Sequence, residues 1–175
     1  MVSKLQDFLD IANDEVGYEE GSGNDNKYGE HFGRNYEPWC AFFICWCADQ
    51  AGILTDSDDA DCPYIPFTGS TSEMKRLYAK NRRDLSPSMN EANPNYPMPG
   101  DLVTIKPTGS SSESHIGIVY EVDGNTVTTI EGNISDKVKK VTYTDLVAPS
   151  YGTIVTLLSN NCLLYTSDAA DDLTR

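Results

Sequence analysis

The sequence has no long apolar run. Its longest, from Ala41 to Ala48, is far shorter than the roughly 20 residues that a membrane-spanning helix needs, so we expect no membrane span. The amino terminus also lacks the apolar segment of a signal peptide, because Asp7 and Asp10 interrupt it. We therefore expect the protein to leave a cell by another route, unless its leader is missing.

Basic residues and histidines are scarce. The 13 Lys and Arg against 27 Asp and Glu give a formal net charge of −14, so a polyanion would be repelled and nucleic acid is not an expected partner. Only 2 His are present, which excludes a metal centre built from several histidines. The HExxH, P-loop and GxSxG signatures are absent as well. Chemistry based on one cysteine and one histidine remains.

The length of 175 residues suits one domain, and 39% apolar with 10% aromatic residues is typical of a globular chain. We expect the domain to cover residues 1–161. Residues 162–175 follow no helical or strand pattern, and we interpret them as a non-domain tail, disordered or artefactual. The 5 cysteines are an odd number, and Cys45 and Cys47 point to different sides of one predicted helix, so no disulfide framework is expected.

Helices are predicted in the first half of the chain. Residues 3–16 form an amphipathic stripe that ends at Gly17. Residues 38–51 are apolar on nearly all sides, which predicts a helix in the middle of the core, with Pro38 in its first turn and Gly52 at its C-terminal cap. The polar segment 55–99 contains one short helix, whose capping box pairs Ser70 with Glu73, and such an insertion often borders a substrate groove.

Alternating apolar residues predict strands in the second half of the chain. They cover Leu102 to Lys106, His115 to Val122, Thr126 to Glu131, Val138 to Tyr143 and Tyr151 to Leu158. Helices followed by an antiparallel sheet predict an α+β domain, in which N-terminal helices pack on a C-terminal β-sheet.

Cys40 is the candidate nucleophile. It falls in the first turn of the apolar helix, where the positive end of the helix dipole and free backbone N–H groups favour a thiolate. Cys45, Cys47 and Cys62 lack such a position, and we interpret them as small buried apolar residues. Cys162 lies outside the region with helical or strand patterns, so we infer no role for it.

A cysteine nucleophile needs a base, and the chain offers His115 and His31. The strand alternation places His115 on one face with Gly117, whose small size would leave room for a substrate. His31 lies in a predicted loop nine residues before Cys40, and we interpret it as the weaker candidate.

Glu131 and Asn133 are the candidates for the group that orients the imidazole of His115. A two-residue turn at 123–124 would pair Glu131 with Ile116 and place it on the wrong face. A three-residue loop at 123–125 instead pairs Glu131 with Gly117 and Asn133 with His115. We therefore predict the longer loop, with Asn125 in the left-handed region.

At this point the chain resembles the CHAP family, the cysteine- and histidine-dependent amidohydrolases and peptidases of bacterial and phage cell-wall lysis. The matching stretches are Lys27-Tyr28-Gly29, Pro38-Trp39-Cys40-Ala41, Trp46 to Gly52, Pro99-Gly100-Asp101, His115 to Val119 and Thr129 to Asn133. The resemblance implies a papain-like fold, with Cys40 as nucleophile, His115 as base and Glu131 or Asn133 as the orienting group.

The resemblance also implies a peptidoglycan substrate, cut at the sugar-to-peptide amide or within the stem or cross-bridge peptides through a thioester. We expect a monomer that acts at the bacterial cell wall after phage-type release from the host cytoplasm. Because the acidic chain would not be attracted to anionic wall polymers, a wall-binding module in the full-length protein is a further expectation. No cofactor is required, although some relatives bind calcium and the loop 21–29 carries suitable oxygens.

Three other readings of the sequence stay open at this stage. The chain could be a papain-like wall-binding module without turnover, in which Cys40 only packs. It could be a cysteine hydrolase of non-wall amides, such as a transglutaminase-like or bacteriocin-processing enzyme. It could also be a purely structural α+β domain.

Overall fold

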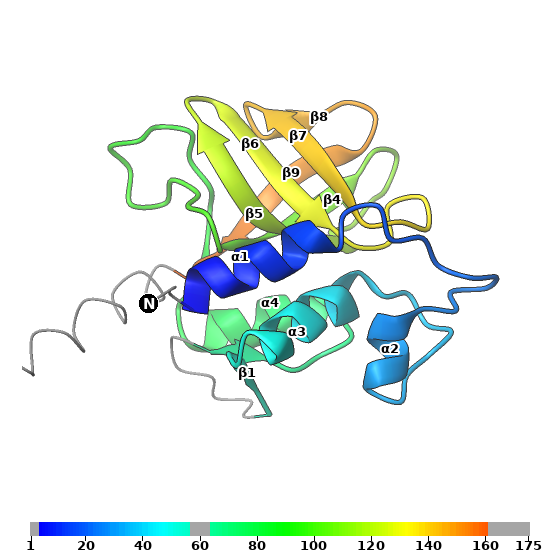
Figure 1. Ribbon diagram of the computed structural model, residues 1–175. Coiled ribbons are helices and arrows are strands. Elements are labelled where there is room, and N and C mark those ends of the chain that lie inside the picture. Colours follow the sequence, from blue (N-terminus) through cyan, green and yellow to red (C-terminus); the bar gives the residue numbers. More distant parts are fainter. Residues whose placement is uncertain (1–3, 57–63, 161–175) are drawn as a thin grey trace, which may run out of the picture.

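The computed structural model describes residues 4–56 and 64–160, and Figure 1 shows the arrangement of their elements. The helices are α1 (Lys4–Asp14), α2 (Lys27–His31), α3 (Cys40–Gln50) and α4 (Thr71–Lys80). The strands are β1 (Leu54–Thr55), β2 (Ile65–Pro66), β3 (Asp84–Leu85), β4 (Leu102–Pro107), β5 (His115–Asp123), β6 (Thr126–Glu131), β7 (Lys139–Thr144), β8 (Val147–Ala148) and β9 (Gly152–Leu158).

The large sheet closes on itself. Its strand order is β3-β9-β4-β5-β6-β7-β8, and β8 pairs with β9 as well as with β7, so six antiparallel strands form a barrel, and β3 pairs with the C-terminal end of β9. The predicted papain-like α+β arrangement, with N-terminal helices packed on a C-terminal antiparallel sheet, is therefore wrong. The closing strand is only two residues long and follows Asp145 and Leu146, which both have left-handed backbone angles. So short a strand has no readable alternation.

Two hydrophobic cores result from this closure. One fills the barrel with inward-facing side chains, namely Val103, Ile105, Val119, Val127, Val141, Tyr143, Ala148, Ile154 and Leu157. The other lies between the helices and the outer face of the barrel, where Ile116 and Ile118 of β5 join the buried side chains of α1 and α3. Figure 1 shows α1, α3 and α4 together on one side of the barrel, so this side alone carries the second core.

Helix α1 buries Leu5, Phe8, Leu9 and Ala12, as its apolar stripe predicts. The stripe ends earlier than expected, because Val16 lies beyond the helix and is exposed. Helix α3 is buried on nearly all sides, and its C-terminus is closed by Gly52 at φ 67. It begins at Cys40 and not at Pro38, so Cys40 is the first helical residue.

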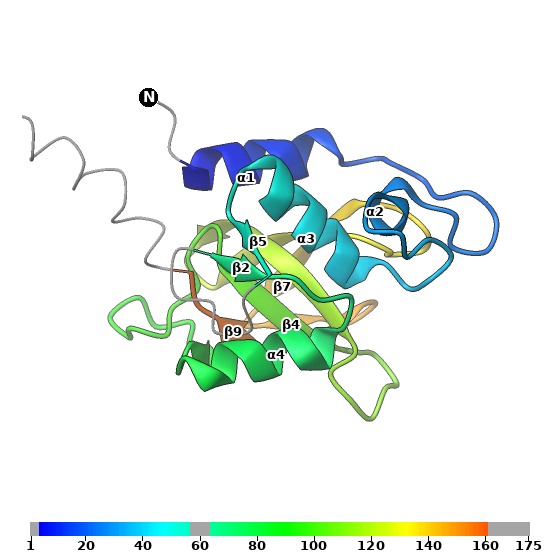
Figure 2. The ribbon, with the colours of Figure 1, turned by 90° about the horizontal axis from the view of Figure 1, so that it is seen from below.

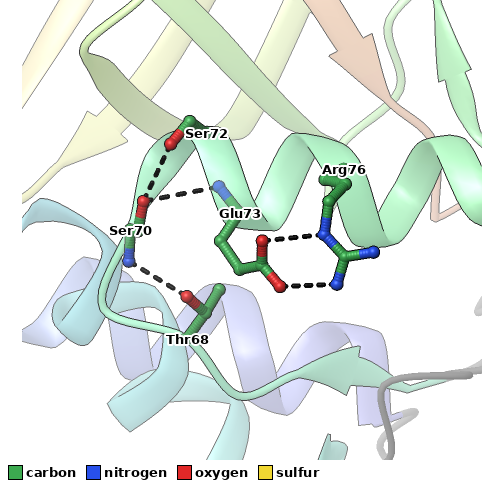
Figure 3. A network of polar contacts seen from close by, with 5 residues as sticks. All are labelled: Thr68, Ser70, Ser72, Glu73 and Arg76. Atoms are coloured by element: carbon green, nitrogen blue, oxygen red, sulfur yellow. Dashed lines mark hydrogen bonds and ion pairs between the residues drawn. The ribbon is translucent and has the colours of Figure 1, made fainter.

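The first turn of α4 is only half of the predicted capping box (Figure 3). The Ser70 hydroxyl accepts a hydrogen bond from the Glu73 N–H at 3.4 Å, as expected of an N-cap residue. The Glu73 carboxylate pairs with Arg76 instead of returning to the Ser70 N–H, which donates to the Thr68 hydroxyl at 3.1 Å. Thr68 therefore takes the role that the capping box gives to Glu73.

All five predicted strands are present as β4, β5, β6, β7 and β9, with ends shifted by one residue at most. The short strands β1, β2, β3 and β8 were not predicted, because two residues show no period. Among the described residues, no helix has both the length and the apolar character that crossing a membrane requires.

Candidate active site

Trp39 fixes the start of α3. Its ring is fully buried and packs against Tyr28, with ring centroids 5.1 Å apart and a stacked arrangement. Its indole N–H donates to the carboxylate of Glu20, so the one polar atom of the ring is satisfied. The residue that precedes Cys40 is therefore anchored on both sides, and Cys40 itself keeps 9% of its surface exposed.

The thiol of Cys40 and the imidazole of His115 form one polar pair. Burial raises the pKa of Cys40, but the hydrogen bond and the charge of His115 outweigh it, and the net pKa lies below the ordinary thiol value. Burial likewise lowers the pKa of His115, yet its bonds to Cys40 and Glu131 raise it to about 10. Both shifts favour a thiolate beside an imidazolium.

Glu131 lies on the far side of the imidazole. Its Oε2 is 2.8 Å from Nε2 of His115, and neither atom has a hydrogen-bond partner elsewhere in the described residues. The Glu131 side chain is fully buried, whereas 12% of the His115 side chain is exposed. Since Nε2 faces Glu131, the other ring nitrogen is the one that serves the thiol.

Two hydroxyl groups support the buried carboxylate. Oε1 of Glu131 accepts hydrogen bonds from the Thr129 hydroxyl and, at 2.8 Å, from the Tyr143 hydroxyl. A buried carboxylate without such partners would be strongly destabilising. The expected room for a substrate at Gly117 is taken by Glu131, because a Cβ on Gly117 would lie 2.7 Å from Cγ of Glu131.

The hairpin that aligns His115 with Glu131 differs from the predicted one. Asp123 pairs with Thr126, so the turn has two residues, and Gly124 rather than Asn125 is left-handed. The three-residue loop is therefore wrong. The register shifts by one residue at Tyr120, however, and Ile118 then pairs with Ile130.

Continued by one residue, this register places Gly117 opposite Glu131, as predicted. The bulge at Tyr120 supplies the extra residue that the prediction assigned to the turn. His115 and Glu131 consequently share the inner face of the barrel, at the end that lies nearest to the start of α3.

Asn133 lies near this group but does not complete it. It lines a cavity of about 250 Å³ together with His115, Glu131 and Tyr143. Its side-chain amide donates to Oδ1 of Asn24 at 3.5 Å, and it forms no hydrogen bond with His115. The structure therefore brings together Cys40, His115 and Glu131, with Asn133 at the rim.

His31 has a different environment. Its Nε2 is 2.9 Å from Oδ2 of Asp49, and both side chains are exposed, at 38% and 42%. This surface pair engages the imidazole of His31, whereas the imidazole of His115 is the one that contacts the Cys40 thiol.

Thr71 is a site residue that the sequence reasoning missed. Its hydroxyl lies 3.8 Å from Sγ of Cys40 and helps to lower the pKa of the thiol, after the larger effects of burial and His115. It follows the N-cap of α4 directly, so its position beside Cys40 depends on how two separate helices pack. Tyr143 was missed for a similar reason, because it reaches Glu131 from β7 only in the folded barrel, whereas Thr129 lies two residues before Glu131 on the same strand.

The loop 21–29 was the expected place for a calcium ion. Oδ1 of Asp25 accepts from the Asn35 amide at 2.7 Å, and Oδ1 of Asn26 accepts from the Gly29 N–H at 2.7 Å. The first bond ties the loop to Asn35, and the second caps the N-terminus of α2. In residues 4–56 and 64–160, no three His, Cys, Asp or Glu side chains are grouped as metal ligands. Calcium binding stays a prediction.

Comparison with known proteins gives one family and two structures. The CHAP domain family matches residues 31–133. No curated protein matches the chain. Two similar solved structures are the crystal structure of Ly7917 and that of Ly7917 with the hydrolyzing product of MDP, at 16% and 17% identity and a TM-score of 0.48 each.

Each of these two comparisons covers 87% of this chain and 61% of the other one, so the chain spans less than two thirds of their length. The family match covers residues 31–133 of this chain. It contains Cys40, His115 and Glu131, ends at Asn133 and extends over more than half of the 175 residues. The resemblance found in the motifs is confirmed by this match, and the chain belongs to the CHAP domain family.

Proposed function

We propose that this chain hydrolyses an amide bond of bacterial peptidoglycan, with Cys40 as nucleophile, His115 as general base and acid, and Glu131 as the orienting group. One observation carries the proposal: the Cys40 thiol contacts an imidazole whose opposite nitrogen faces a fully buried carboxylate. A row of nucleophile, base and orienting group is what thiol-dependent acyl transfer requires.

Acylation begins at the thiolate. Sγ of Cys40 attacks the amide carbonyl carbon, and the carbonyl oxygen takes up the negative charge. The backbone N–H of Cys40 is available to stabilise that oxygen, because a first-turn N–H has no acceptor within its own helix. The imidazolium of His115 then gives its proton to the leaving amine nitrogen, the C–N bond breaks, and a thioester remains.

Deacylation reverses the role of His115. The neutral imidazole takes a proton from water, the resulting hydroxide attacks the thioester carbon, and Sγ leaves as a thiolate beside the imidazolium. The product is a carboxylic acid. Glu131 keeps its position throughout, since the hydroxyls of Thr129 and Tyr143 hold its other oxygen.

The family supports the choice of substrate, and the cleaved bond is either the sugar-to-peptide amide or a bond within the stem or cross-bridge peptides. The acidic chain, at −14, would be repelled by anionic wall polymers. We therefore include in the proposal a separate wall-binding module in the full-length protein. Strong lysis of intact cells by this chain alone would contradict that part.

The test compares the chain with its Cys40→Ala variant on purified peptidoglycan. Fragments are identified by mass, which also distinguishes new amino termini from free muramyl groups. We expect wild type to release fragments at least about a thousandfold faster than Cys40→Ala. Cys45→Ala is the matched control, because Cys45 lies on the same helix outside the site, and its rate should stay within about threefold of wild type.

Three outcomes would reject the proposal. If wild type releases no fragments while iodoacetamide still labels Cys40 selectively, the domain has a reactive thiol but acts on another amide. If wild type and Cys40→Ala release equal fragments, Cys40 is not the nucleophile. Absence of both release and labelling would favour a binding module in which Cys40 only packs.

A further inference from the structure

A second cavity begins beside the nucleophile. It has a volume of about 500 Å³ and is bordered by α4, β4, the segment between β4 and β5, and β9. Thr71, whose hydroxyl lies 3.8 Å from Sγ of Cys40, is part of its wall. Figure 2 shows α4 on the same side of the barrel as β4 and β9. A substrate bound at Cys40 can therefore extend into this cavity.

The charged groups of the cavity are Lys75, Lys106 and Glu113. Glu113 is fully engaged: its carboxylate contacts the Lys75 ammonium at 2.8 and 3.0 Å and accepts hydrogen bonds from Thr104 and Thr156. Partial burial raises the pKa of Glu113, but these bonds outweigh it and lower the pKa below its usual value. Glu113 and Lys75 thus neutralise each other.

Lys106 is the remaining charge. It is exposed, and its ammonium group forms no hydrogen bond or ion pair with any described residue. The cavity therefore presents one uncompensated positive charge in a chain whose net charge is −14. A substrate amine would be repelled by Lys106 and would find Glu113 already bound to Lys75. A substrate carboxylate would find a partner.

The distance from the nucleophile limits which carboxylate can reach this charge. Lys75 follows Thr71 by one turn of α4, or about 6 Å at the usual helical rise. An extended peptide covers about 3.3 to 3.6 Å per residue. Lys75 and Lys106 line the same cavity, so a substrate group that reaches the level of Lys75 in this cavity lies one or two residues from the scissile amide.

We propose that this cavity is a carboxylate-binding subsite, in which Lys106 binds a free carboxylate of the substrate peptide one or two residues from the scissile amide. The proposal rests on the proposed function, because the peptide must be held at Cys40. It makes Lys106 a specificity residue that distinguishes a free carboxylate from the corresponding primary amide.

The test uses two synthetic wall peptides of one sequence, which differ only in carrying a free carboxylate or a primary amide at that position. Binding is measured by calorimetry in the Cys40→Ala background, and cleavage is measured with Cys40 intact. We expect the carboxylate peptide to bind about tenfold more tightly, as for one partly screened charge-assisted hydrogen bond. Lys106→Gln should reduce that ratio to about one, and Lys106→Arg should retain it.

Lys140→Gln is the matched control, since it also removes one positive charge but lies on β7, over the ring of Tyr120. Its ratio should equal that of the parent. Equal binding of both peptides, binding of neither, or an unchanged ratio in Lys106→Gln would each overturn the subsite. Cleavage of both peptides without preference would reject the subsite but not the proposed hydrolase function. Preferential binding without cleavage would support the subsite but reject the hydrolase function.

Discussion

Helix α3 carries three cysteines, and only Cys40 among them is bonded to an imidazole. Cys45 and Cys47 are fully buried, and burial raises the pKa of Cys45 to about 12 and that of Cys47 well above its usual value. Burial acts on Cys40 in the same direction, yet its pKa is lowered. The difference lies in the partner, because His115 bonds to Cys40 while Cys45 lies 3.3 Å from the carbonyl oxygen of Thr68.

This comparison changes the account of why Cys40 is reactive. The positive end of a helix is worth about 0.3 to 1 kcal/mol, which is less than one pKa unit. That effect is too small to reverse the burial of a thiol. The position at the start of α3 mainly directs Sγ toward His115, and the imidazole supplies the charge.

The largest effect on this comparison should come from removing the imidazole. In His115→Gln, Cys40 loses the partner that lowers its pKa, so its chemistry should approach that of Cys45. We expect peptidoglycan hydrolysis to fall at least about a thousandfold, and iodoacetamide labelling of Cys40 at pH 7 to fall about tenfold or more. His31→Gln is the control, and its rates should stay near wild type. Equal losses in both variants would contradict the assignment.

A smaller effect should follow when the orienting carboxylate becomes an amide. Glu131→Gln keeps the size of the side chain but removes the charge beside Nε2, which helps to raise the pKa of His115. We expect kcat to fall about a hundredfold with little change in KM, because the tautomer and the imidazolium lose support.

Asn133→Ala is the companion variant, because Asn133 was the alternative orienting group. Its amide is hydrogen-bonded to Asn24 and not to His115, so we expect its kcat to stay within about threefold of wild type. Melting curves for both variants should establish that each is folded. A larger loss of kcat in Asn133→Ala than in Glu131→Gln would show that Asn133, and not Glu131, orients His115.

The site was more predictable from the sequence than the contacts that support it. Helix position indicated Cys40, and strand parity indicated His115 together with Glu131 or Asn133; both are local properties of the chain. The contact with Thr71, and that of Tyr143 with Glu131, join segments far apart in sequence, so no local pattern reveals them. The predicted pairing of Glu131 with Gly117 was correct although the predicted loop was wrong. A bulge in β5 and a turn that is one residue longer both shift the pairing of the two strands by one residue.

The fold was predictable up to the closure of the sheet. The apolar stripes of α1 and α3 and the alternation of the five long strands are encoded within each element. Closure depends on β8, two residues that pair with both β7 and β9. Nothing local distinguishes Val147 and Ala148 from a turn, and so the barrel was not predicted.

The smallest effect is the pH dependence, which compares the thiols of Cys40 and Cys45 in the unmodified chain. Hydrolysis needs deprotonated Cys40 and protonated His115, so it should rise as pH passes the lowered thiol pKa and fall about tenfold per pH unit above the His115 pKa of about 10. Labelling of Cys40 needs only the thiolate and should reach a plateau instead of falling. Cys45 should stay unlabelled throughout, because it is buried and its pKa is about 12. Hydrolysis that continues undiminished to pH 11, or parallel labelling of Cys40 and Cys45, would contradict the ion pair.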